Sequence, residues 1–171
     1  IENGCVDKVN LNAGVLISEV VPHFLVSGSS MSIDGFALEL TNMSKTASDL
    51  SQCNIALINE MGIQGKYVLS TLDISLLSAN ETLVICSYDG DDKFDGACNI
   101  VIEEDGMHKN LAGMTLLGIV CGQNDEIVDL FNLNSFRAAV EQSAVDFVRL
   151  CDADPVTQAA NALLGEGWLI S

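Results

Sequence analysis

Residues 35–42 read Gly35-Phe36-Ala37-Leu38-Glu39-Leu40-Thr41-Asn42. The large apolar side chains of Phe36, Leu38 and Leu40 alternate with small or polar ones. A two-residue period puts the apolar set on one face of a β-strand, so the pattern predicts a strand with one buried face. Nothing in this stretch positions a nucleophile or a base, so the pattern indicates a fold rather than a reaction.

Other short segments show a similar pattern and are separated by polar or glycine-bearing joints. The expected strands are residues 15–21, 35–42, 53–59, 66–70, 82–87, 98–103, 114–120 and 126–131. We expect a polar loop between the first two strands. Residues 134–143 predict one short helix, which Ser135 would cap, and residues 145–150 again alternate like a strand. This order of elements is typical of an all-β sandwich.

The order of segments also resembles the lamin-tail domain family, whose members are immunoglobulin-like β-sandwiches. The resemblance rests on Ile17-Ser18-Glu19, on the strand 35–40, and on Asp49-Leu50-Ser51-Gln52-Cys53 before the third strand. It covers about residues 15–131 and continues more weakly to Trp168. The chain departs from the family pattern at Gln52 and Cys53, where glycine and tryptophan are usual.

The resemblance implies an immunoglobulin-like, lamin-tail-like domain over residues 15–171 with one short helix. It also implies that Arg149 and Trp168 correspond to an arginine segment and a tryptophan element near the end of the family domain. Residues 1–14 precede this domain as an N-terminal extension. Val9, Leu11 and Ala13 alternate in the extension, so it predicts a strand that pairs either with a neighbouring copy or within its own domain.

The charge of the chain is strongly acidic, with 24 acidic and 7 basic residues and a formal net charge of −17. Binding to nucleic acid or to an anionic membrane surface requires a basic surface. No apolar run approaches the roughly 18–20 residues that span a bilayer. We therefore expect no nucleic-acid partner and no membrane insertion.

Six cysteines are spread along the chain without the spacing of a zinc or redox motif. They are Cys5, Cys53, Cys86, Cys98, Cys121 and Cys151. An even count of this kind favours disulfides in an oxidising compartment, although buried free cysteines would also fit. Cys86 and Cys98 flank one acidic loop and form the best local candidate for a bridge.

Two sequons point in the same direction, towards an extracellular or cell-surface protein. Asn42-Met43-Ser44 and Asn80-Glu81-Thr82 are N-glycosylation acceptor triplets. Both fall where the strand pattern places turns, and a glycan requires an exposed position. Asn42 and Asn80 are therefore the candidate glycosylation sites.

One acidic loop is a candidate metal site. Asp89, Asp91, Asp92 and Asp95 stand together with two glycines in residues 89–96. Calcium takes six to eight oxygen ligands from flexible loops, so these four aspartates are candidate calcium ligands. The loop lacks the closing glutamate of an EF-hand, and the same composition also describes a solvated acidic loop. Calcium is the only cofactor that the sequence suggests.

Catalysis has little support in the sequence. The two histidines, His23 and His108, do not stand near a serine or cysteine motif. Glycine-rich phosphate loops of the required spacing are missing. The sequence thus favours a non-catalytic extracellular structural protein, a self-assembling fibre or cell-surface subunit that binds other copies of itself, or glycans and other cell-surface proteins. The alternatives are an adhesion module for carbohydrate or protein, and an accessory domain of a secreted hydrolase.

Overall fold

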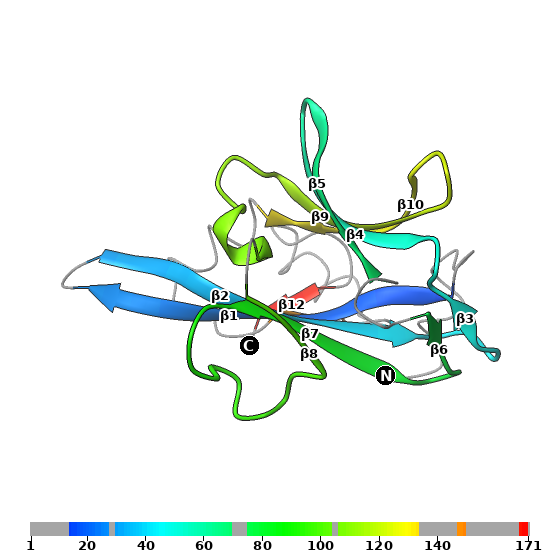
Figure 1. Cartoon of the computed structure of the whole chain (residues 1–171), viewed down its shortest axis with the longest axis horizontal. Coiled ribbons are helices and arrows are strands. Elements are labelled where there is room, and N and C mark those ends of the chain that lie inside the picture. Colours follow the sequence, from blue (N-terminus) through cyan, green and yellow to red (C-terminus); the bar gives the residue numbers. More distant parts are fainter. Residues whose placement is uncertain are drawn as a thin grey trace.

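A computed structural model describes residues 14–27, 30–69, 75–103, 106–133, 147–149 and 168–170. Two β-sheets lie one above the other (Figure 1). The prediction of an all-β sandwich is confirmed. The helix expected at residues 134–143 and residues 1–13 of the N-terminal extension lie outside the described residues.

The first sheet has the strand order β12-β11-β1-β2-β7-β8. All its neighbours pair antiparallel except β7 and β8, which are parallel. The strands are β1 (Val15–Ser27), β2 (Ser30–Asn42), β7 (Thr82–Tyr88), β8 (Ile100–Ile102), β11 (Phe147–Arg149) and β12 (Trp168–Ile170). The antiparallel pairing of β1 with β2 runs from Val15↔Asn42 to Ser27↔Ser30.

The second sheet has the antiparallel order β10-β9-β4-β5. Its strands are β4 (Cys53–Asn59), β5 (Gly62–Val68), β9 (Leu116–Cys121) and β10 (Glu126–Asn132). Further short elements stand outside these two sheets. They are the two-stranded pair β3 (Ser48–Asp49) and β6 (Leu76–Leu77), and η2 (Met107–Lys109), a single turn of 3-10 helix.

The core confirms that the two sheets face each other. Phe36, Leu38 and Leu40 of β2 pack in one cluster with Ile55 and Leu57 of β4, and all five are nearly inaccessible to solvent. The cluster is completed by Ile85, Leu117, Ile119, Phe131 and Leu133, among others. The alternation seen in residues 35–42 is therefore the inward face of β2, as a half-buried strand requires.

The prediction of a polar loop between the first two strands is wrong. β1 continues to Ser27 and β2 begins at Ser30, with Phe24 opposite Ile33. Serines make part of this segment polar, but two of its cross-strand pairs, Phe24↔Ile33 and Val26↔Met31, join large apolar residues, which favours a ribbon. Figure 1 shows this hairpin extending beyond the rest of the sheet, at the left of the view.

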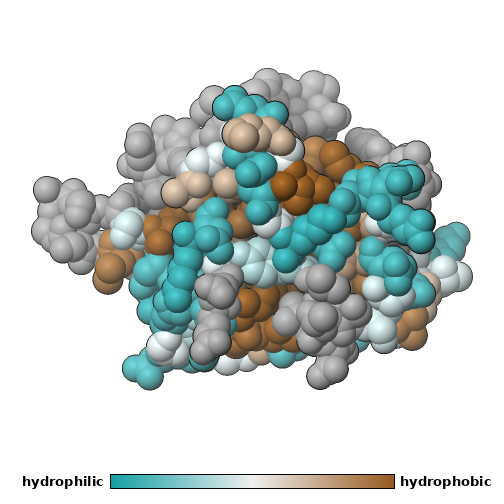
Figure 2. Space-filling view, turned by 45° about the horizontal axis from the view of Figure 1, so that its top comes forward, coloured by the Kyte–Doolittle hydropathy of each residue, from teal (hydrophilic) through white to brown (hydrophobic). Residues whose placement is uncertain are grey.

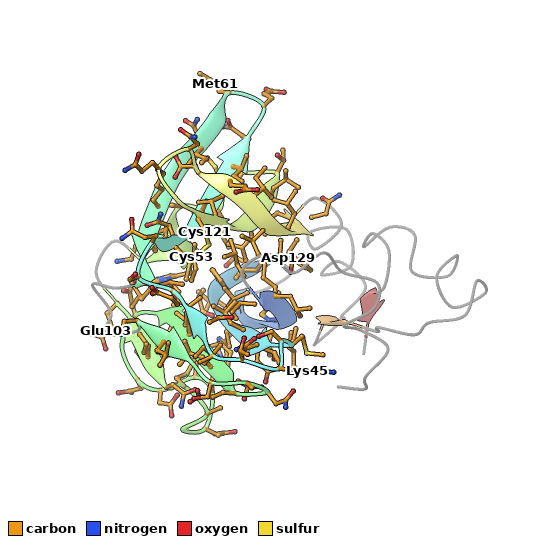
Figure 3. The ribbon with its side chains drawn as sticks, turned by 90° about the vertical axis from the view of Figure 1, so that its right-hand side faces the viewer. Lys45, Cys53, Met61, Glu103, Cys121 and Asp129 are labelled. Carbon is orange, nitrogen blue, oxygen red and sulfur yellow. A yellow bond between two sulfur atoms is a disulfide. The ribbon has the colours of Figure 1, made fainter. Side chains whose placement is uncertain are left out.

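The two sheets are joined at one side by a hydrogen bond between β1 and β10. The backbone N–H of Ile17 donates to Asp129 Oδ2 at 2.8 Å. The register of β1 against β2 shifts between Ile17 and Glu19, and such an irregularity leaves a backbone group without its ladder partner. Figure 3 shows Asp129 lying between the sheets. The carboxylate satisfies the backbone donor of a fully buried residue.

Two disulfides lie within the described residues. The predicted bridge Cys86–Cys98 is confirmed, and it ties β7 to the acidic loop. The second bridge joins Cys53 to Cys121, which stand directly opposite each other on β4 and β9 (Figure 3). This bridge lies inside one sheet rather than between the two sheets. Cys5 and Cys151 lie outside the described residues, and their pairing stays a prediction.

Candidate functional site

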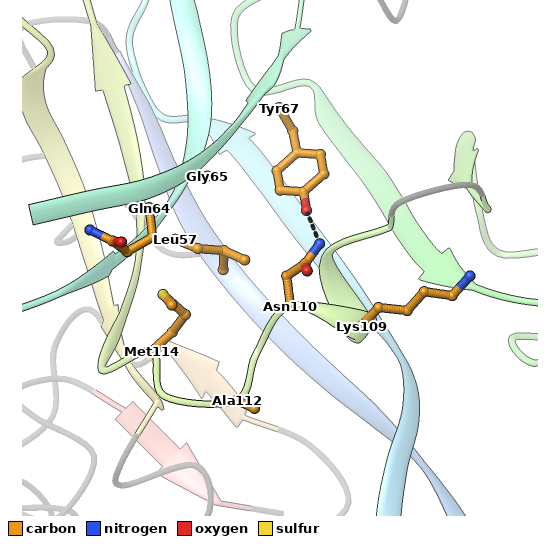
Figure 4. Close-up of a pocket in the computed structure, with 8 residues that line it drawn as sticks. All are labelled: Leu57, Gln64, Gly65, Tyr67, Lys109, Asn110, Ala112 and Met114. Carbon is orange, nitrogen blue, oxygen red and sulfur yellow. Dashed lines mark hydrogen bonds between the residues drawn. The ribbon is translucent and has the colours of Figure 1, made fainter.

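A pocket of about 340 Å³ opens between β5 and the segment that follows η2 (Figure 4). Its lining residues are Leu57, Gln64, Gly65, Tyr67, Lys109, Asn110, Ala112 and Met114. Leu57 and Met114 supply an apolar floor, and the rim is polar. Its volume is at the lower end of the range for small-ligand sites. None of the site residues predicted from the sequence lines this pocket.

The pocket wall is held in place by specific contacts. Met107 is fully buried and anchors η2 in the core. Asn110 Nδ2 donates to Tyr67 Oη at 3.0 Å, which joins the segment after η2 to β5 (Figure 4). The Thr115 N–H donates to the Ile58 carbonyl at 2.8 Å and returns the chain to the second sheet. The segment that forms one wall of the pocket is therefore tied to β5 by a side-chain hydrogen bond and to β4 by a backbone hydrogen bond.

Next to η2 lies a serine–histidine–aspartate arrangement that was not predicted from the sequence. Ser87 Oγ lies 2.7 Å from His108 Nδ1, and His108 Nε2 lies 3.4 Å from Asp89 Oδ2. Lys109 Nζ lies 3.0 Å from the same oxygen. The hydrogen bond from Lys109 lowers the pKa of Asp89, and the neighbouring His108 ring acts in the same direction, although its buried Nε2 has no hydrogen-bond partner among the described residues. Such groups resemble a catalytic triad by type.

This arrangement fastens η2 to β7 and does not expose a nucleophile. Ser87 is 0% exposed, so a substrate cannot reach its hydroxyl in this structure. The same Oγ also accepts the backbone N–H of His108 at 3.1 Å. We assign Ser87, Asp89 and His108 a structural role, which is to hold η2 against β7. Ser87 and His108 are 21 residues apart in the sequence, and no sequence motif of this spacing could have revealed their contact.

The acidic loop 89–99 is held against the outer face of the first sheet. Phe94 and Cys98 pack against the buried cluster of Ala37, Cys86 and Tyr88. At the base of the β1–β2 hairpin, Asp34 contacts His23 Nδ1 at 2.6 Å and Lys93 Nζ at 3.2 Å. Burial acts to raise the pKa of Asp34, but the hydrogen bonds from His23 and Lys93 outweigh it and lower the pKa.

The four predicted calcium ligands do not converge. Asp89 is turned towards Lys109. Asp92 folds its own loop, because its Oδ1 accepts the Phe94 N–H at 2.9 Å and its Oδ2 accepts the Gly96 N–H at 2.6 Å. Within the ranges that the structure describes, no group of three or more histidine, cysteine or acidic side chains is placed to hold a metal ion. Asp92 acts in this structure as a turn residue.

Asp92 should also make the fold sensitive to acid. The backbone hydrogen bonds from Phe94 and Gly96 lower its pKa below the usual 3.8. A lowered pKa in the folded state means that the ionised carboxylate stabilises the fold above about pH 4, and that this contribution is lost as pH falls through the folded pKa. Asp92→Asn should lower the urea midpoint at pH 6, and the difference from wild type should shrink as the pH falls below the usual pKa of an aspartate and through the lowered pKa of Asp92.

The matched control for this prediction is Asp91→Asn, which removes an exposed carboxylate from the same loop. Its urea midpoint should follow that of the wild type throughout the pH series. Equal midpoints for Asp92→Asn and wild type at pH 6 would contradict the assignment of Asp92 as a turn residue.

The two predicted glycosylation sites differ sharply in burial. Asn42 is 0% exposed, and its Nδ2 donates to the carbonyls of Thr46 and Leu77 at 2.8 and 2.9 Å. Its Oδ1 accepts both the N–H and the hydroxyl of Ser44. Asn80 is exposed on the turn before β7. A glycan on Asn42 would remove hydrogen bonds that join separate segments, whereas Asn80 leaves room for one.

We therefore predict that a eukaryotic secretory host attaches a glycan at Asn80 and leaves Asn42 unmodified. Asn80→Gln should remove the mass of one glycan from the purified protein. Asn42→Gln should leave that mass unchanged but lower the free energy of unfolding by about 1–3 kcal/mol, because buried polar groups lose their partners. Intact-mass spectrometry and urea unfolding give the two readouts. A glycan found on Asn42 of the folded protein would refute the prediction.

Within the described residues, no helix is long and apolar enough to cross a bilayer. A scan of protein-family models and a search of curated proteins found no match to this chain. The lamin-tail resemblance therefore stays a prediction, and function has to be argued from the pocket, the sheet edges and the charge of the chain.

Proposed function

We propose that this protein is a non-catalytic extracellular structural subunit, an immunoglobulin-like domain of lamin-tail type that assembles with copies of itself into a fibre or cell-surface layer. The single observation that carries the proposal is the end of the β1–β2 hairpin. We call residues 24–27 and 30–33 the arm. The two described disulfides are compatible with the extracellular part of the proposal.

The arm pairs only with itself among the described strands. β2 pairs with β7 as far as Gly35↔Tyr88, and β1 pairs with β11 only at Glu19 and Val20. Beyond these positions both outer edges of the ribbon have no strand neighbour in the described ranges. A two-stranded ribbon is marginally stable in water, and an open edge is a template for another chain.

The composition of the arm fits a contact between copies. Residues 24–33 contain no charged residue in a chain of net charge −17. Leu25 is 53% exposed, and Figure 2 shows hydrophobic surface at the left, on the side where Figure 1 places the arm. Copies of an acidic protein repel one another, and the repulsion is smallest where no charge stands. The arm is therefore the described segment best suited to approach a second copy.

The acidic surface also predicts how assembly responds to salt. Mobile ions screen exposed charges beyond about 10 Å at 0.1 M ionic strength. Added salt should therefore strengthen assembly, because it weakens repulsion between copies while leaving apolar contacts intact. The N-terminal extension 1–14 remains a second predicted donor strand.

The test compares two matched variants by light scattering and electron microscopy. Leu25→Asp adds one negative charge to the arm, and Ile127→Asp adds one to β10 at a side chain that is 55% exposed. The wild type and Ile127→Asp should form polymers in salt, and Leu25→Asp should stay monomeric. Deletion of residues 1–14 tests the extension in the same assay. A wild-type chain that stays monomeric at high concentration and high salt would refute the proposal.

The second candidate function is a binding module for carbohydrate or protein. The pocket favours it, because Tyr67 offers an aromatic ring and Gln64 and Asn110 offer amides at one opening. A monomeric wild-type chain that binds glycans, with binding lost in Tyr67→Ala, would select this candidate instead.

A further inference from the structure

We infer that the edge of β5, together with the pocket beside it, is the acceptor that receives the arm of a neighbouring copy. This inference rests on the proposed function and names the partner of the arm. Arm and acceptor occupy different parts of the molecule, with the arm at the left of Figure 1 and β5 at the top. A contact between unlike surfaces is heterologous and builds rings or open filaments.

The position of β5 in its sheet leaves it open to strand addition. The order β10-β9-β4-β5 places β5 at the end, so one of its edges has no strand neighbour within the described residues. Extended segments commonly bind by adding a strand to such an edge, where main-chain hydrogen bonds supply the affinity. The outer edges of the arm also have no strand neighbour in the described ranges. Main-chain hydrogen bonds can therefore form between the arm of one copy and β5 of another.

Gly65 stands in β5 and lines the pocket. Its φ does not fall in the left-handed region, and an added Cβ would meet only Tyr67 Cε2, at 3.9 Å. The fold therefore does not require glycine at this position. At Gly118, by contrast, a Cβ would meet Leu130 Cδ2 at 3.0 Å and the Asp129 carbonyl at 3.3 Å.

A glycine inside a strand weakens it and often marks a bulge or the close approach of another backbone or a ligand. Gly65 lies next to such an irregularity, because the register of β5 against β4 shifts between Leu57↔Gly65 and Ile58↔Ile63. Gly65 has no such close neighbour among the described residues of its own chain. The glycine therefore leaves room at the pocket for a side chain of a second copy. The pocket beside Gly65 then has the role that side-chain pockets have in strand addition, which is to fix the register of the incoming strand.

The chemistry around the pocket suits an uncharged arm. Leu57 and Met114 form an apolar floor for an apolar side chain such as Leu25. On β5, Lys66 Nζ lies 2.6 Å from an oxygen of Asp125, and Lys109 Nζ at the pocket rim lies 3.0 Å from Asp89 Oδ2. Two of the seven basic residues thus neutralise acids next to the acceptor. At these two positions the arm meets paired charges.

The experiment combines a variant that lacks the donor with a variant that lacks the acceptor. Leu25→Asp disables the arm and keeps β5 intact. Gly65→Val adds a side chain on the pocket side of β5, where a Cβ would meet no atom closer than 3.9 Å, and narrows the pocket that receives the arm. Circular dichroism and thermal unfolding verify that Gly65→Val is folded. Ala112→Trp is a second acceptor variant, which fills the pocket from an exposed position outside the strands.

We expect each variant alone to require at least about tenfold more protein to assemble than the wild type. An equimolar mixture of Leu25→Asp and Gly65→Val should form a discrete dimer, because one copy keeps a working arm and the other a working acceptor. The dimer cannot grow, since its remaining arm and its remaining acceptor are both disabled. Sedimentation velocity measures monomer, dimer and polymer in one run.

The outcomes separate this inference from the proposed function. A polymer formed by Gly65→Val and by Ala112→Trp would overturn the acceptor while leaving the proposed function standing. A mixture without dimers would overturn the pairing of arm with β5. Self-pairing of Gly65→Val would overturn it too, in favour of contact between two arms. A monomeric wild type would overturn both proposals.

Discussion

Replacement of both Cys53 and Cys121 by alanine is expected to lower the free energy of unfolding by about 4 kcal/mol. The bridge closes a loop with a sequence separation of 68 residues. In the chain-entropy account, a cross-link restricts the unfolded chain more strongly when the closed loop is longer. Domains of this size are stable by only about 5–15 kcal/mol, so the loss would remove a large share of the total.

The matched control is the second bridge, whose loop has a sequence separation of only 12 residues. Alanine at both Cys86 and Cys98 should cost about 3 kcal/mol. Each pair contains one nearly inaccessible cysteine, with Cys53 at 2% and Cys86 at 0% exposure, so the cavities left by truncation are similar. The difference between the two losses in free energy of unfolding therefore reports the effect of loop length.

Urea unfolding of the oxidised proteins measures both changes, with equal slopes indicating that the transitions are comparable. A larger loss for the Cys86–Cys98 variant would contradict the prediction. It would show that attachment of the acidic loop to the first sheet matters more than restriction of the unfolded chain.

Phe131→Ala is expected to lower the free energy of unfolding by about 3–5 kcal/mol. Phe131 on β10 is 1% exposed and packs in the main core cluster between the sheets. Truncation to alanine loses the transfer free energy of the ring and leaves a cavity that the neighbouring strands can fill only in part. For a domain of this length, the loss corresponds to a fall in melting temperature of roughly 10 °C.

Ile127→Ala provides the control on the same strand. Ile127 is 55% exposed, so its truncation should change the free energy of unfolding by less than about 1 kcal/mol. Thermal and urea unfolding give the two values. Equal losses for the two variants would mean that β10 does not close the core as the structure indicates.

Strand positions could be predicted because their signal is local. The segment 53–59 coincides with β4, and 82–87 falls inside β7. In both, a short run rich in apolar residues is bounded by polar or glycine-bearing joints, and that contrast appears in the sequence itself. The Cys86–Cys98 bridge could be predicted for a similar reason, because the two cysteines flank one short loop.

The residues of the pocket could not be predicted from a local pattern of this kind. The pocket combines Leu57 on β4, Gly65 on β5 and Met114 beyond η2, which come together only when the second sheet forms. Gly65 was a usable signal, because a glycine beside an expected strand indicates either a bend or a close approach. Composition alone also does not show that Asp92 bonds to its own backbone, and calcium binding by the acidic loop stays a prediction.

The sequence by itself determined the all-β class, the main strands and the local bridge, because side-chain periodicity and short spacings depend only on neighbouring residues. The tertiary structure alone decided which strands pair, and hence the opposition of Cys53 and Cys121, the burial of Asn42 and the contact of Ser87 with His108. These depend on sheet order and register, which follow from packing two faces against each other across long chain separations. The edges of the arm and of β5 that have no strand neighbour among the described residues also depend on sheet order, because an edge exists only once the order of the strands is set.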